Sequence, residues 1–208
     1  MEKIDYMKQL KHLYCPSAKK VEIVTIPQMN FLMIDGAGNP NTSQDYKDAL
    51  EALYGLAYTL KFGVKQGKYG QKTYDYPVMA LEGLWWMDDM REFSVARKDD
   101  WKWAMMIMQP DIITPDWVEL ARADLIKKKH PVAASKIRFD AYHEGRSAQI
   151  MYFGPYADEG PTIQRLHDFI IESGHQLRGK HHEIYLGDPR RTAPEKLKTV
   201  LRHQAERF

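Results

Sequence analysis

Apolar side chains recur every three or four positions in two segments of the chain, which is the spacing of one face of a helix. The first segment begins at Ser43, with Thr42 or Ser43 as its cap, and its apolar positions continue to Val64. The second segment covers about 161–173. Both are therefore predicted to be amphipathic helices, each with one face turned towards a core.

A third helix is predicted at 114–129 from the residues at its start. Thr114 can cap it, Pro115 fits the first helical position, and Asp116 is favourable near the positive end of the helix dipole. Residues 143–147 (HEGRS) indicate a turn, and 195–203 are compatible with either a strand or a helix. Strands are predicted from β-prone runs at 21–36, 78–87, 101–110, 136–142, 148–156 and 181–186.

The two halves of the chain repeat one order of elements, strand–helix–strand–strand. The segments that begin at Met29 and at Arg146 each contain a strand, a Gly/Pro turn and then an amphipathic helix. We interpret this as an internal duplication within an α+β fold. The predicted arrangement is one domain over 1–208, with half one at about 21–110, a linking helix at about 114–129 and half two at about 136–203.

One acid is embedded in a β-prone run of each half, Glu82 in LEGLWW and Glu183 in HEIYLG. Alternation along a strand places Tyr185 on the same face as Glu183. An acid in a strand is commonly a solvated charge or a salt-bridge partner, and an unpartnered buried carboxylate is expensive. The functional alternative is a carboxylate in an aromatic-walled cavity, because acids with perturbed pKa values gather at such sites.

Composition narrows the class of function. The formal charge of +2, without a basic run, gives no electrostatic reason to expect direct contact with nucleic acid. The single cysteine, Cys15, excludes an internal disulfide, and no signal peptide or membrane-spanning run is visible. We therefore expect a soluble, cytoplasmic protein. Five Trp, twelve Tyr and eleven Met supply side chains that suit a pocket for flat, apolar ligands.

No known catalytic motif stands out in the sequence. The eight histidines show no HExxH or Cys–His spacing, so no metal site is expected. The GxGxxG, P-loop and GxSxG motifs are all absent from the sequence. No cofactor is predicted.

Three stretches resemble the GyrI-like small-molecule-binding family: YPVMALEGLWW (76–86), IMYFGPYADEGPTIQRLHDFI (150–170) and HHEIYLGDPRRTAPEKLKTVLRH (181–203). The resemblance extends over most of the chain from Val21. It implies a duplicated SHS2-type module, as in the effector domains of multidrug-sensing regulators. Its pseudo-twofold halves face each other around a cleft for planar, often cationic or polyaromatic ligands. Glu183 corresponds to the pocket carboxylate of the drug-binding members.

The strands EGLWW and WKWAMMIMQP resemble those of stand-alone bacterial members without a DNA-binding region. That subgroup is associated with detoxifying hydrolysis of cyclopropane-containing DNA alkylators of the duocarmycin and yatakemycin type. For such a substrate we expect Glu183 to be the base that activates water, with direct attack by Glu183 as the less favoured variant. Tyr152, Tyr54 or Tyr185 would then donate a hydrogen bond to the substrate carbonyl. The residues expected to bind the flat ligand are Tyr54, Glu82, Trp85, Trp86, Trp103 and Tyr185.

Two other functions stay open. One is a non-catalytic protein that binds or senses small molecules, in which Glu183 only neutralises a bound cation. The other, suggested by the family name, is inhibition of DNA gyrase through protein contact. The sequence leaves the oligomeric state and the natural ligand open.

Overall fold

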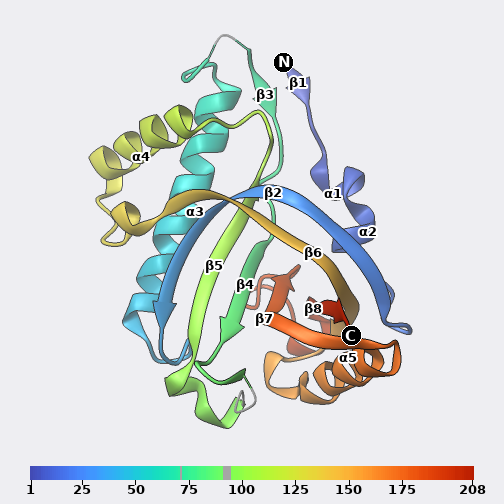
Figure 1. Ribbon diagram of the computed structural model, residues 1–208. Helices are drawn as coiled ribbons and strands as arrows, with labels where there is room; N and C mark the ends of the chain where they lie inside the picture. Colours follow the sequence, from blue (N-terminus) through green and yellow to red (C-terminus); the bar gives the residue numbers. More distant parts are fainter. Residues whose placement is uncertain (71, 91–94) are drawn as a thin grey trace. The chain divides into compact units, whose positions relative to one another are not determined.

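The structure is a computed structural model that describes residues 1–70, 72–90 and 95–208 (Figure 1). It is an α+β protein, as predicted. Its helices are α1 (Tyr6–Gln9), α2 (Lys11–Tyr14), α3 (Gln44–Lys65), α4 (Pro115–Lys129) and α5 (Gly160–Glu172). Its strands are β1 (Glu2–Lys3), β2 (Glu22–Ala37), β3 (Tyr74–Asp75), β4 (Leu81–Trp86), β5 (Lys102–Gln109), β6 (Arg138–Phe153), β7 (His175–Tyr185) and β8 (Lys198–Arg207). Within the described residues, no helix is both long enough and apolar enough to cross a membrane.

The predicted order of elements is confirmed. In the first half, β2 and α3 are followed by β4 and β5, and the two-residue strand β3 lies between α3 and β4. In the second half, β6 and α5 are followed by β7 and β8. The helix caps act as expected. The Ser43 side chain accepts a hydrogen bond from the Tyr46 amide at 3.2 Å, and Thr114 accepts one from the Trp117 amide at 3.3 Å.

The turn predicted at 143–147 is wrong, because these residues lie within the continuous strand β6. Gly145 has a φ of +74°, a conformation that a glycine adopts without steric penalty, so the strand deforms locally instead of reversing. The carbonyl of the preceding residue, Glu144, accepts a hydrogen bond from the Gln204 side chain at 2.7 Å. A glycine beside polar residues therefore marks a local irregularity here, not the end of the strand.

The segment that the sequence left open as strand or helix is β8, from Lys198 onwards. β7 begins at His175, well before the predicted start at 181. Its pairing with β8 shifts register between Arg178 and His181. Gly179 lies in this interval with a φ of +71°, so it gives β7 the flexibility to continue past the irregularity.

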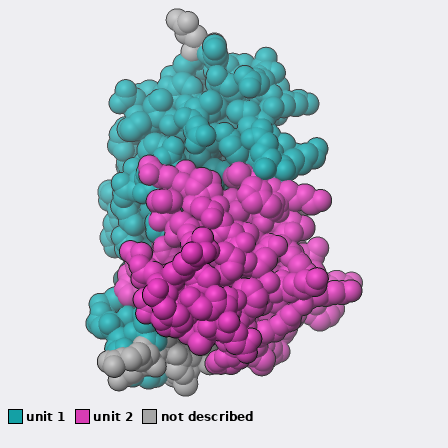
Figure 2. Space-filling model, turned by 45° about the vertical axis from the view of Figure 1, so that its right-hand side comes forward, with its two compact units in different colours: residues 1–9, 29–79, 87–142 teal, residues 10–28, 80–86, 143–208 magenta. Residues whose placement is uncertain are grey.

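One compact unit consists of residues 1–9, 29–79 and 87–142 (Figure 2). In it, Asn30–Ala37 of β2 pair antiparallel with β5, and α3 packs against β5. α4 lies beside α3 (Figure 1). The buried face of α3 includes Leu53, Leu56 and Leu60, at the spacing that predicted the helix.

The other compact unit consists of residues 10–28, 80–86 and 143–208. Its strands follow the order β4-β7-β8-β6, and each neighbouring pair is antiparallel. α5 packs on one face of this sheet through a fully buried apolar cluster: Ala148, Ile150, Leu166, Ile170, Leu201 and Ala205. The predicted sequence halves, and the ligand cleft expected between them, stay predictions.

Candidate functional site

Glu183 lies on the face of the sheet that α5 covers. On β7 it pairs with Gly83 of β4 on one side and with Leu201 of β8 on the other. Leu201 belongs to the apolar cluster beneath α5, which identifies the face. Because Gly83 has no side chain, the residue paired with Glu183 on β4 places no side chain beside the Glu183 carboxylate.

Tyr185 and Trp85 join Glu183 in a hydrogen-bonded chain. The Tyr185 hydroxyl donates to Glu183 Oε2 at 2.7 Å and accepts from the Trp85 indole nitrogen at 3.0 Å. Glu183 is 6% exposed and Trp85 3% exposed, whereas Tyr185 is half-buried. The Tyr156 ring meets the Tyr185 ring edge to face, with centroids 5.4 Å apart. The structure thus brings together three of the residues predicted from sequence: Glu183, Tyr185 and Trp85.

His181 holds the other oxygen of the same carboxylate. Its Nε2 atom lies 3.2 Å from Glu183 Oε1, and both side chains are almost inaccessible to solvent. Burial raises the pKa of Glu183, but the contacts with His181 and with the Tyr185 hydroxyl outweigh burial and lower it below its ordinary value. Glu183 is therefore an ionised carboxylate at neutral pH.

Two further imidazoles lie next to His181. The His203 ring centroid is 6.3 Å from that of His181 and 5.1 Å from that of His167 on α5. Burial lowers the pKa of His203 to about 3 and that of His167 to about 4, and electrostatic interaction with His181 adds to both effects. His203 and His167 are consequently neutral at physiological pH.

Glu82 faces the opposite side of the sheet, where it is fully buried. Its register partner on β7 is Ile184, so it shares a face with His182 and not with Glu183. Glu82 Oε1 accepts from the Tyr14 hydroxyl at 2.7 Å, and Oε2 lies 3.0 Å from His182 Nε2. The acid that the sequence treats as the counterpart of Glu183 is thus tied into a separate network.

That network continues through Glu144 and Arg202. His182 Nδ1 lies 3.0 Å from both Glu144 oxygens, and an Arg202 nitrogen donates to Glu144 at 3.2 Å. The same guanidinium donates to Gln149 at 2.9 Å and to the Leu13 carbonyl at 2.7 Å. An arginine guanidinium is positively charged throughout the physiological pH range, so this network contains a permanent cation.

The titration of this network reflects its paired charges. Burial alone would lower the pKa of His182, but Glu144 and Glu82 raise it to about 9. Burial would raise the pKa of Glu144, but His182 and Arg202 lower it to about 2. His182 is therefore an imidazolium, and two cations face two carboxylates.

Tyr152 is on the face of Glu183 but further across the sheet. It pairs with Thr199 of β8, which in turn pairs with Tyr185, so two strand spacings, about 10 Å, separate the backbones of the two tyrosines. The Tyr152 hydroxyl donates to the Pro155 carbonyl at 3.0 Å. Trp86 is half-buried, and the Lys180 ammonium lies 3.4 Å from its ring centroid.

The two remaining predicted residues belong to the other unit. Trp103 on β5 is 1% exposed and meets the Tyr46 ring edge to face at 5.1 Å. Its indole covers Gly36 so closely that a Cβ atom there would lie 2.2 Å from it. Trp103 is therefore tightly packed within its unit. Tyr54 on α3 is 36% exposed.

A family model for the GyrI-like small molecule binding domain matches residues 19–203. The chain belongs to this family. It is 37% identical to an uncharacterized conserved protein from Listeria innocua, over 98% of this chain and all of that one, with a TM-score of 0.88. It is 36% identical to a hydrolase encoded by lin2189 from the same organism, over 99% of this chain and all of that one, with a TM-score of 0.86.

A more distant structure shares only the fold of this GyrI-like domain. The C-terminal domain of EcmrR is 10% identical over 91% of this chain and 98% of that one, with a TM-score of 0.56. No curated protein matches the chain.

Sequence reasoning missed His181 and Tyr156 beside Glu183. The signal for His181 was present, since it stands two residues before Glu183 in a strand and hence on the same face. Tyr156 contacts the site only through tertiary packing, which no local pattern announces. Among the described residues, no group of three or more His, Cys, Asp or Glu side chains is arranged to hold a metal ion.

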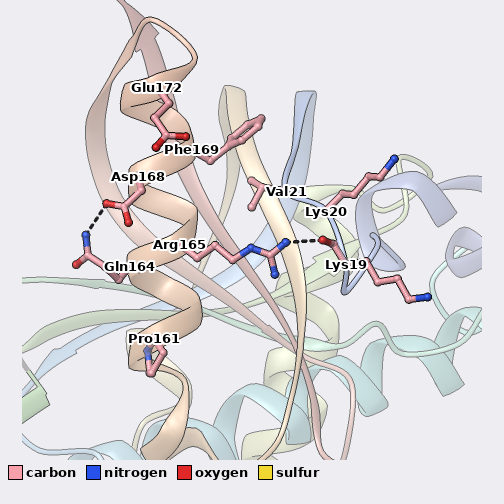
Figure 3. A pocket seen from close by; sticks show the side chains of 9 residues that line it. All are labelled: Lys19, Lys20, Val21, Pro161, Gln164, Arg165, Asp168, Phe169 and Glu172. Carbon is pink, nitrogen blue, oxygen red and sulfur yellow. Dashed lines mark hydrogen bonds between the residues drawn. The ribbon is translucent and has the colours of Figure 1, made fainter.

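A groove of about 730 Å³ lies elsewhere in the same unit, between α5 and residues 19–21 (Figure 3). Arg165 donates to the Lys19 carbonyl across it, and Gln164 donates to Asp168 at 2.8 Å. Its polar side chains are exposed and of both charges. The groove thus lacks the buried, ionised group that distinguishes the site at Glu183.

Proposed function

We propose that this GyrI-like domain binds flat, hydrophobic compounds and hydrolyses the cyclopropane ring of DNA alkylators of the duocarmycin and yatakemycin type. The observation that carries the proposal is the ionised Glu183 carboxylate, held by His181 and Tyr185 beside the Trp85 ring. The 36% identity to proteins described as hydrolases supports an enzymatic role. Detoxification of such compounds would be the biological outcome.

In the proposed reaction, water adds across the strained ring. Glu183 takes one proton from water while the water oxygen forms a bond to the cyclopropane methylene carbon. The ring carbon–carbon bond breaks, and its electron pair moves through the conjugated dienone to the carbonyl oxygen, which becomes a phenolate. The proton held by Glu183 returns through solvent to the phenolate. The net change is the addition of one water.

The tyrosines divide the remaining work in this proposal. Tyr185 already contacts Glu183, so it orients the water at the attacked carbon. The carbonyl oxygen lies at the far end of the conjugated ring, and Tyr152, about 10 Å from Tyr185 across two strands, is the donor we assign to it. Trp85, whose register partner is His181, supplies flat surface for the ligand on the face of Glu183, whereas alternation along β4 places the predicted ligand contact Trp86 on the opposite face. The predicted roles of Tyr54, Glu82 and Trp103 in binding are less favoured by their local contacts.

Drug binding without catalysis is the second candidate. It is favoured by the lowered pKa of Glu183, because an ionised carboxylate beside the Tyr185 and Trp85 rings also suits a planar cation. In that case the protein would sequester its ligand unchanged.

The deciding experiment incubates the purified protein with a cyclopropanoid alkylator and follows the compound by mass spectrometry. We expect the product to gain one water, at a rate that Glu183→Gln lowers about 10²–10⁴-fold, the usual contribution of a general base. Glu183→Gln should still bind the compound, and quenching of tryptophan fluorescence measures that binding.

Glu195→Gln is the matched control, because it removes an exposed acid of the same unit. It should hydrolyse the compound at the wild-type rate. Recovery of intact compound bound stoichiometrically to the wild-type protein would favour the binding function instead. A fully active Glu183→Gln would overturn the assignment of the base.

A further inference from the structure

We propose that His181 is a positioning residue of this site, which holds the Glu183 carboxylate in the ionised and oriented form that a base requires. The inference rests on the proposed function, because it assigns His181 a part in that reaction. It concerns a residue that neither the sequence motifs nor the relatives single out.

The geometry fixes both carboxylate oxygens. His181 and Glu183 stand two apart on β7, so their side chains leave the same face of the strand. His181 Nε2 lies 3.2 Å from Oε1, while the Tyr185 hydroxyl donates to Oε2 at 2.7 Å. With one partner on each oxygen, rotation of the carboxylate away from the site would break a buried contact.

Several titratable groups lie around the His181–Glu183 pair on the surrounding elements. His203 comes from β8 and His167 from α5, and both are neutral because burial lowers their pKa values to about 3 and about 4. Glu159, just before α5, also hydrogen-bonds to the Glu183 side chain. Among the described imidazoles around this carboxylate, His181 is thus the one in direct contact with it.

The consequence concerns the pH at which the base fails. Burial raises the pKa of Glu183, and contact with His181 is the largest influence that lowers it. A base works only while ionised, so activity falls as the pH drops through its pKa. Without His181, the effect of burial is less fully offset, and the pKa of Glu183 therefore rises. As the pH is lowered, activity is then lost at a higher pH than in the wild type.

The test compares the wild-type protein with His181→Gln, which keeps a polar N–H group but has no ionisable ring. The pH profile of kcat/KM for the cyclopropanoid alkylator should show an acid limb that moves upward by about 1–3 pH units. Above that limb, His181→Gln should approach wild-type activity. Circular dichroism verifies folding, and His181→Asn replaces the glutamine variant where the latter does not fold.

A second measurement does not depend on hydrolysis. The Glu183 carboxyl carbon, assigned by its absence in Glu183→Gln, is titrated by ¹³C NMR in the wild type and in His181→Gln. The pKa should be higher in the variant. His203→Gln is the matched control, because it replaces a neighbouring neutral imidazole and should leave the pKa of Glu183 in place.

The outcomes separate the two proposals. An unchanged acid limb and an unchanged carboxyl titration in His181→Gln would overturn the role of His181. So would an activity loss of the same factor at every pH, which indicates a merely structural residue. A wild-type protein that does not hydrolyse the compound would overturn the proposed function, while the NMR titration would still decide on His181.

Discussion

Neighbouring residues of β7 carry two different charged clusters on opposite faces of one sheet. On the side of His182, two carboxylates face Arg202 and an imidazolium whose pKa is raised to about 9. On the side of Glu183, the cationic partner is His181, among imidazoles that stay neutral. Both clusters are buried, but only the second includes a half-exposed phenol, Tyr185.

This difference distinguishes a structural acid from a reactive one. Glu144 is held by the Arg202 guanidinium and by His182, whose pKa of about 9 keeps it positively charged at neutral pH. Glu183 is instead held by one imidazole, His181, and by the hydroxyl of the half-exposed Tyr185, with no guanidinium in contact. Burial alone therefore does not identify a functional acid, whereas the nature of its partners does.

The largest contrast should appear in stability. Glu144→Gln leaves Arg202 and His182 with one carboxylate fewer, and breaking a buried pair in this way costs about 3–5 kcal/mol. Glu183→Gln should cost about 1 kcal/mol, because its partners are an imidazole and a half-exposed hydroxyl, and no buried guanidinium loses a carboxylate. Urea unfolding of the two variants measures both values. Equal losses would remove the distinction between the faces.

The pH dependence of stability should also come from the His182 side. Because the pKa of His182 is raised from 6.5 to about 9, its stabilising contribution is complete below pH 6.5 and is lost as the pH rises through 9. We expect a loss on the order of 2–3 kcal/mol by pH 9.5. Thermal unfolding between pH 6 and about pH 9.5 tests this. The loss should be absent in His182→Gln, and its persistence there would point to another group.

A smaller contrast concerns the two tyrosines that donate to these acids. Tyr14→Phe removes the donor to the fully buried Glu82 and should cost about 2 kcal/mol. Tyr185→Phe should cost about 0.5 kcal/mol, because water can replace the hydroxyl at a half-exposed position. Denaturant midpoints of the two variants give the comparison, and the reverse order would contradict it.

The helices and the order of the strands followed from sequence because their signals are local. Ser43 and Thr114 cap their helices as the pattern predicts, and α5 ends at Glu172, just before Gly174. The turn at 143–147 failed because Gly145 fits a strand irregularity as well as a turn. Local composition does not separate these two uses of glycine.

The sequence drew attention to Glu82 and Glu183 but did not indicate that they face opposite sides. Their faces depend on the register between β4 and β7, in which Gly83 and not Glu82 pairs with Glu183. A shift of one residue in register exchanges the faces, and no local pattern specifies it. The Tyr14–Glu82–His182 contacts were missed for the same reason, since their members lie far apart in the chain.

The central claim is that the face of Glu183 performs the chemistry while the face of Glu144 supports the fold. Mass spectrometry of a cyclopropanoid alkylator incubated with Glu183→Gln and with Glu144→Gln tests it most directly, under conditions in which both variants are folded. The account predicts that Glu144→Gln adds one water to the compound at close to the wild-type rate, while Glu183→Gln does so about 10²–10⁴-fold more slowly. Hydrolysis by Glu183→Gln at the wild-type rate, together with its loss in folded Glu144→Gln, would contradict the account.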